Sequence, residues 1–116
     1  MRYFTLKEFD SPDEKGSGAK MDEQFLLRLE AARHLAGTPF VINSGYRTPA
    51  HNKKVGGKPN SSHLKGVACD IKVTSSANRL KIMEALILLD FKRIGVASGF
   101  IHVDCDNEKP KALWTY

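Results

Sequence analysis

Two of the four histidines lie where a metal-binding role would explain their positions. His63 comes shortly before a glycine turn at Gly66, and His102 lies in an apolar segment that gives a histidine no packing function. Together with Asp70 they offer two imidazoles and one carboxylate, a common ligand set for catalytic zinc that leaves one position open for water. The spacing alone leaves two alternatives open: a zinc site, or three unrelated polar residues around a cleft.

Alternation along two predicted strands places these side chains on comparable faces. Successive side chains of a strand point to opposite faces, so His102 and Asp104 share the polar face of the last predicted strand. Asp70 lies on the polar face of an earlier predicted strand. If the two strands are neighbours, Asp70 and His102 converge, and the glycine turn can bring His63 over the same point.

The elements that must position these residues are helices and short strands. Helices are expected where apolar residues recur at helical spacing behind a capping residue, and strands where short apolar runs occur. The expected order is a short helix from Thr5, a loop over 11–20, a helix from Met21 to Gly37, a strand at 40–42, a short helix from Thr48 to Lys54, a turn over 55–62, a strand at 67–73, a helix from Ser75 or Ser76, and a hairpin of 93–96 and 100–105. This order predicts an α+β domain with helices packed on a small, mostly antiparallel sheet.

Each of the two long helices carries an apolar stripe that is expected to face the sheet. Residues three and four positions apart share one face of a helix. The expected inward residues are Phe25, Leu26, Leu29, Ala32 and Leu35 in the first helix, and Leu80, Met83, Leu86, Ile87 and Leu89 in the second.

Size and charge limit the class of protein. With 116 residues, of which 41% are hydrophobic, the chain is expected to form one domain over residues 1–116. Its net charge of +5 suits an anionic partner, either nucleic acid or an anionic cell wall. The sequence has neither a basic recognition helix nor an aromatic stacking platform, so nucleic acid is not expected as a partner.

The sequence also bears on location and on covalent links. No apolar stretch approaches the ~20 residues that span a bilayer, so no membrane partner is expected. The N-terminal residues do not resemble a signal peptide, so synthesis in the cytoplasm is expected. The chain is also expected to be a monomer. Cys69 and Cys105 are too few for a disulfide framework and are expected to act as small core residues, with a disulfide between them left open.

Several segments carry a family likeness. The pattern S-x-H-x-x-G-x-A-x-D occurs in full over 61–70, S-G-Y-R occurs at 44–47, and F-I-H-V-D occurs at 100–104. With these motifs the chain resembles the zinc D-Ala-D-Ala carboxypeptidase family, which includes VanX-type dipeptidases and phage endolysin peptidases and has a hedgehog-type fold. The opening residues 3–9 resemble compact, phage-borne members, so the likeness covers roughly residues 3–105.

The resemblance implies a role for each matched residue. It makes His63, Asp70 and His102 the ligands of one Zn²⁺ per chain, which would activate a water molecule. It makes Arg47 the residue that stabilises the oxyanion or holds the substrate, and it places Ser61 near the site as a substrate-binding residue. The implied activity is that of a zinc peptidase, carboxypeptidase or endopeptidase, that hydrolyses D-Ala-containing peptidoglycan stem peptides. Such a chain would act on the cell wall, released at lysis if it is encoded by a phage.

One departure from the family pattern bears on mechanism. Larger members place a glutamate three residues before the final histidine as general base and acid, and this chain has Gly99 there. Asp104 is the best remaining carboxylate to transfer the proton, and orientation of the His102 imidazole is its alternative role. Gly99 also favours a second function, a non-catalytic zinc-binding module for wall docking or phage structure. The bond that is cut stays open between a D-Ala–D-Ala, an L-Ala–D-Glu and a cross-bridge link.

Overall fold

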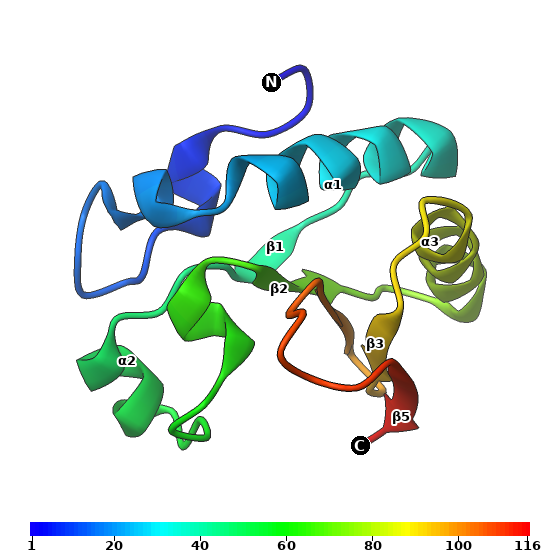
Figure 1. The fold of residues 1–116 in the computed structure, drawn as a ribbon. Coiled ribbons are helices and arrows are strands. Elements are labelled where there is room, and N and C mark those ends of the chain that lie inside the picture. The colour runs from blue at the N-terminus through cyan, green and yellow to red at the C-terminus, as the bar shows by residue number, and fades with distance from the viewer.

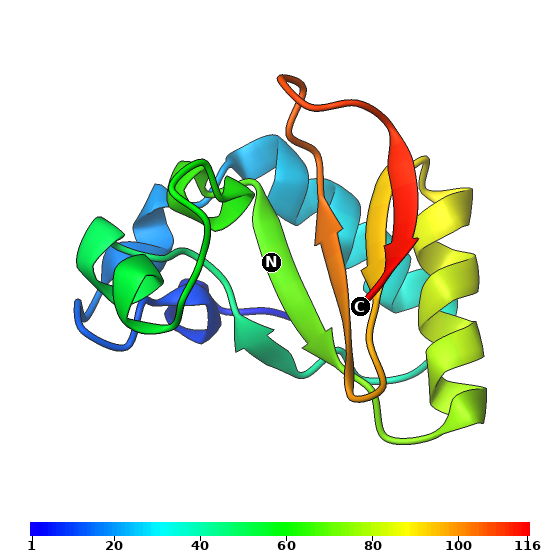
Figure 2. The ribbon, with the colours of Figure 1, turned by 90° about the horizontal axis from the view of Figure 1, so that it is seen from below.

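A five-stranded sheet lies at the centre of the computed structural model, which describes residues 1–116. Neighbouring strands follow the order β1-β2-β4-β3-β5, and the first three pairings are antiparallel whereas β3 and β5 are parallel. The strands are β1 (Ile42–Ser44), β2 (Ala68–Lys72), β3 (Arg93–Val96), β4 (Phe100–Asp104) and β5 (Ala112–Thr115). Figure 2 shows the sheet face-on. The predicted α+β class with a mostly antiparallel sheet is confirmed.

Helices cover one face of this sheet and leave the other to the candidate site. The long helices α1 (Glu23–Ala36) and α3 (Ser76–Leu88) pack against each other and against the covered face. The short helix α2 (Pro49–Lys54) and the 3₁₀ turn η3 (Ser62–Lys65) lie beside the end of β2 on the other side (Figures 1 and 2). Two further 3₁₀ turns near the N-terminus are η1 (Leu6–Phe9) and η2 (Ser17–Lys20).

The buried apolar side chains form one cluster between the helices and the sheet. Its largest fully buried members are Phe9, Phe25, Leu29, Ile71, Ile82, Leu86, Ile101 and Val103. The strand residues of this cluster come from the apolar faces predicted by alternation, so the polar faces of β2 and β4 point away from the helices. No helix of the chain combines the length and the apolar character that crossing a bilayer requires.

The helix ends follow from local sequence. The Asp22 carboxylate accepts from the Phe25 amide at 2.9 Å at the start of α1, and Gly37 ends it in the left-handed region at φ 64°. Thr48 caps α2 ahead of Pro49, and Ser75 caps α3. Gly37, Thr48 and Ser75 were among the residues that predicted these ends, whereas the start of α1 was expected at Met21 without its Asp22 cap. The predicted hairpin of 93–96 and 100–105 is present as β3 and β4.

Four details differ from expectation. The strand expected at 40–42 is observed at Ile42–Ser44, while Phe40 is buried in the core and Val41, whose carbonyl still accepts from the Lys72 amide, is exposed. The inward faces of the helices also differ: Leu35 of α1 is 52% exposed, and the buried face of α3 consists of Ile82, Ala85 and Leu86, whereas Leu80 is 63% and Ile87 56% exposed. The residues expected to face inward in α3 were the most apolar ones, but helical spacing places them on more than one face of the helix.

The other two differences are additions. The turn η2 forms inside the expected loop over 11–20, because Asp10 accepts hydrogen bonds from the amides of Gly16 and Gly18. The strand β5, which no sequence pattern indicated, pairs in parallel with β3 at the edge of the sheet.

Candidate metal centre and its cleft

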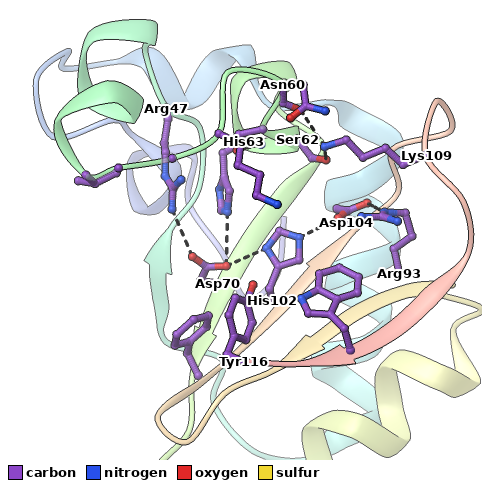
Figure 3. Close-up of a pocket in the computed structure, with 17 residues that line it drawn as sticks. Arg47, Asn60, Ser62, His63, Asp70, Arg93, His102, Asp104, Lys109 and Tyr116 are labelled. Carbon is purple, nitrogen blue, oxygen red and sulfur yellow. Dashed lines mark hydrogen bonds and ion pairs between the residues drawn. The ribbon is translucent and has the colours of Figure 1, made fainter.

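Three side chains from two strands and one turn meet on the polar face of the sheet. Asp70 on β2 and His102 on β4 are directly paired across the sheet, and η3 brings His63 over them. His102 Nδ1 lies 3.0 Å and His63 Nε2 lies 3.4 Å from Asp70 Oδ1 (Figure 3). One donor atom from each residue lies within 4.8 Å of the others, so the three could hold a metal ion.

The position of His63 depends on the tight turn around it. Ser61 Oγ accepts from the His63 amide at 3.2 Å and so begins η3, and Gly66 ends it in the left-handed region at φ 71°. A Cβ at Gly66 would also lie 2.4 Å from the carbonyl oxygen of Lys20, so only glycine fits this turn. The S-x-H-x-x-G spacing therefore has a structural reason, and Ser61 both caps the turn and lines the cleft.

Each imidazole is fixed by a hydrogen bond at its outer nitrogen. His63 Nδ1 lies 2.7 Å from the Gly45 carbonyl oxygen, and His102 Nε2 lies 2.7 Å from Asp104 Oδ2. A carbonyl oxygen can only accept, so Nδ1 of His63 carries the proton and Nε2 presents its lone pair to the centre. The ionised Asp104 carboxylate likewise accepts a hydrogen bond from His102 Nε2, so that Nδ1 can present its lone pair to a bound cation. Two lone pairs and one carboxylate facing a single point suit a cation such as Zn²⁺.

Asp70 has the charge that such a site requires. Burial opposes its ionisation, but the imidazoles of His102 and His63, which donate to this carboxylate when they carry a proton on the facing nitrogens, outweigh burial and hold the pKa of Asp70 well below its usual value. The carboxylate is therefore ionised at neutral pH. Arg47 adds a further positive charge, with its Nη2 3.5 Å from Asp70 Oδ2.

Arg47 is held in place beside the centre. Its Nε donates to Ser44 Oγ at 3.1 Å and its Nη1 to Asn52 Oδ1 at 3.2 Å, while its backbone amide donates to the His63 carbonyl at 3.1 Å. The S-G-Y-R segment thus connects the arginine to the turn that carries His63. The guanidinium lines the cleft with its direction fixed, as a donor to a carbonyl oxygen or carboxylate must be.

Asp104 lies next to the centre but is not free. Its side chain is 1% exposed, with Oδ2 on His102, and Oδ1 accepts from Arg93 Nε at 2.8 Å and from the Asp106 amide at 3.0 Å. Both oxygens are therefore occupied. Of the two roles considered for Asp104, this geometry supports orientation of the His102 imidazole.

The centre forms the floor of a cleft of about 610 Å³. One side is polar and carries Asn60, Ser62 and Lys109 (Figure 3). Sequence reasoning missed Arg93, Lys109, Trp114 and Tyr116, all of which line the cleft. Trp114 lies on β5 and Tyr116 directly follows this strand, which was not expected from the sequence.

The two cysteines are free thiols on the apolar side of the sheet. Cys69 is paired with Val103 across the strands, and no disulfide links it to Cys105. Burial raises the pKa of Cys105 to about 11 and that of Cys69 well above its usual value, so neither thiol ionises readily. Their expected role as small core residues agrees with this placement.

Comparison with known proteins agrees with the motif evidence. The model of the family described as Peptidase M15 matches residues 2–104. The zinc D-Ala-D-Ala carboxypeptidase of Streptomyces albus G is 32% identical over 77 residues, a match that covers 59% of this chain and 30% of the relative. The similar region is thus less than a third of the relative's length, and the family match ends at the last residue of β4.

Proposed function

This chain belongs to the peptidase M15 family, and on that premise we propose that it hydrolyses D-Ala-containing peptidoglycan stem peptides as a zinc-dependent carboxypeptidase or endopeptidase. The observation that carries the proposal is the convergence of His63, Asp70 and His102 in a cleft, with both imidazoles fixed from behind. The similar Streptomyces protein is itself named a zinc D-Ala-D-Ala carboxypeptidase, which supports this substrate class.

We assign His63 Nε2, His102 Nδ1 and the Asp70 carboxylate as ligands of one zinc ion. Bound zinc would supply a Lewis acid and would lower the pKa of a water molecule to about 7. The protein's own contribution is to hold the ligand side chains in place. Gly45 and Asp104 each fix one imidazole ring, and the Arg47 guanidinium lies beside the Asp70 carboxylate.

Arg47 is the proposed electrostatic partner of the substrate. Its guanidinium is fixed by Ser44 and Asn52, so it needs no reorganisation when negative charge develops on the scissile carbonyl oxygen. The same fork of donors fits a terminal carboxylate. Ser61 is proposed to contact substrate at the rim of the cleft, in addition to capping the turn at His63.

We propose that Asp104 positions His102 rather than transferring a proton. Asp70 and Asp104 are the two carboxylate residues that line the cleft, and each is fully engaged with its neighbours. Gly99 contributes no side chain at the position where larger family members have the glutamate. No other carboxylate lines the cleft, so none is left to transfer the proton.

The alternative function is a non-catalytic zinc-binding module that docks to the cell wall or belongs to a phage structure. Gly99 in place of the glutamate favours this alternative. The open cleft with Arg47 directed into it favours the peptidase, because a docking module needs no fixed guanidinium beside its metal.

Mass spectrometry of purified muropeptides tests the choice. We expect zinc-loaded protein to release defined products: loss of a terminal D-Ala identifies a carboxypeptidase, and separation of cross-linked or internal peptides identifies an endopeptidase. His63→Ala should be inactive, and His34→Ala, a histidine outside the cleft that contacts the Tyr3 hydroxyl, should act like the wild type. Bound zinc without cleavage of any muropeptide would favour the docking module.

A further inference from the structure

The segment after β4 lies beyond the family match, yet it returns to the candidate site. Residues 105–111 loop away from the sheet, and β5 comes back beside β3 with Gly95 opposite Trp114 and Val96 opposite Thr115. This register places Trp114 and Tyr116 along the cleft, with the Tyr116 side chain directed toward Asp70 and His102 (Figure 3). Leu113, which precedes Trp114 and lies on the other face of the strand, is 65% exposed.

Arg93 attaches this segment to the metal centre. Its Nε donates to Asp104, its Nη1 donates to the Pro110 carbonyl, and its guanidinium lies 5.0 Å from the ring centroid of Trp114. Asp104 in turn holds His102. One side chain on β3 therefore binds both the backbone before β5 and the residue that orients a proposed zinc ligand.

Trp114 packs against that ligand directly. The indole and the His102 imidazole have ring centroids 5.6 Å apart. The indole can lie this close to the sheet because its neighbour on β3 is glycine: a Cβ at Gly95 would lie 2.5 Å from Trp114 Nε1. His102 is thus fixed by Asp104 through a hydrogen bond and by Trp114 through packing.

Tyr116 and Phe100 form an aromatic surface on the same side of the cleft. Their ring centroids are 5.2 Å apart, and both residues line the cleft. The opposite side carries Asn60 and Lys109, and the Lys109 ammonium donates to the Asn60 carbonyl oxygen at 2.7 Å and to Ser62 Oγ at 3.0 Å (Figure 3). A peptide lying over the centre would thus have an apolar surface on one side and polar groups on the other.

We infer, on the basis of the proposed function, that β5 is a substrate-binding wall of the active site. The Phe100–Tyr116 surface takes the methyl side chain of an alanine next to the scissile bond, and the polar side takes carboxylates and amides of the stem peptide. Trp114, held by Arg93, is a positioning residue for His102.

A binding experiment can test the wall without catalysis, because Trp114 is the only tryptophan of the chain. The synthetic stem pentapeptide L-Ala-γ-D-Glu-L-Lys-D-Ala-D-Ala is titrated into zinc-free protein while tryptophan fluorescence is followed. We expect a saturable change. Tyr116→Ala should weaken binding by about five-fold, the order expected for one aromatic contact, and Leu113→Ala on the same strand should bind like the wild type.

A second pair of variants tests the positioning role of Trp114. Gly95→Ala should displace the indole, change its emission spectrum and weaken zinc binding in a chelator competition titration. Gly99→Ala, where a Cβ would meet nothing within 4 Å, should leave both the spectrum and zinc affinity unchanged. Equal zinc affinity in Gly95→Ala and wild type would overturn this role.

The outcomes separate the wall from the proposed activity. If the wild type cleaves muropeptides but Tyr116→Ala has the same KM and the same peptide affinity as Leu113→Ala, the substrate-binding role of β5 is wrong. The proposed peptidase activity would then still hold. Failure of the wild type to cleave any muropeptide would overturn the peptidase itself. A higher KM in Tyr116→Ala with kcat retained would support both.

Discussion

Asp70 and Asp104 show how one residue type takes two roles through its surroundings. Both are ionised carboxylates that contact His102, on either side of its ring. Asp70 faces the cleft with His63 and Arg47, whereas Asp104 is enclosed between His102 and Arg93. The first can therefore hold a metal ion, and the second can only hold the ring that does so.

We predict that Asp104→Asn weakens zinc binding by about 10- to 100-fold, the usual effect of removing the partner of a ligating histidine. Cleavage at saturating zinc should remain close to that of the wild type, because no proton transfer is lost. Competition titration and activity at saturating zinc give the two values, with circular dichroism to verify folding. Unchanged zinc affinity with lost activity would instead make Asp104 the proton-transfer residue.

Residue types and strand alternation singled out His63, Asp70 and His102 as candidates, the family resemblance made them ligands and added Arg47, and the structure brings all four together. The engagement of Asp104 was not predictable, because Arg93 reaches it from a neighbouring strand. Alternation tells which face a side chain takes, but not which long side chain from the next strand occupies that face.

At the scale of elements, the turn η3 must be held against the sheet for His63 to reach the centre. Asp106, just after β4, makes this link: it accepts from Ser62 Oγ at 2.7 Å and from Lys65 Nζ at 3.0 Å. Burial opposes ionisation of Asp106, but these hydrogen bonds lower its pKa to about 2. The link is therefore present at neutral pH and is lost only in strong acid.

The depressed pKa predicts a pH-dependent contribution to stability. Asp106 has a lower pKa in the folded state than its ordinary 3.8, so its contribution is complete above about pH 4 and disappears as the pH falls toward 2. We expect Asp106→Asn to be less stable than the wild type at pH 7, by at most about 2 kcal/mol. The difference should vanish near pH 2 in urea unfolding measured across this range. A difference that is independent of pH would contradict the assignment.

Local signals predicted the helix ends, the glycine turn and the β3–β4 hairpin, because each depends on residues close together in the chain. β5 was not predictable in this way. It is short, partly exposed, and stabilised by parallel pairing with β3 and by the Arg93–Trp114 contact. Such pairing depends on the complete sheet. The pairing of β2 with β4 likewise could not be predicted from local sequence.

At the scale of the whole molecule, the net charge of +5 acts over a longer range than the contacts within the cleft. Charge of this sign attracts anionic wall polymers and raises the rate of encounter, an effect that salt screens over a Debye length of about 8 Å at physiological ionic strength. It would act on large anionic substrates and little on a small neutral peptide.

We therefore predict that added salt reduces activity on whole cell walls more than activity on a small neutral peptide. Parallel rate measurements from low to high salt with both substrates test this expectation, with circular dichroism to verify folding at each salt concentration. An equal decrease with both substrates would show that the surface charge has no part in finding the wall.

The most direct test of the proposed zinc-dependent centre is to titrate zinc into chelated, dialysed protein while peptide cleavage is followed. We predict no cleavage without metal and full recovery at about one zinc per chain, with no recovery in His63→Ala or Asp70→Asn. Full activity of the zinc-free protein, or zinc bound at this site without cleavage of any stem peptide, would contradict a catalytic zinc centre.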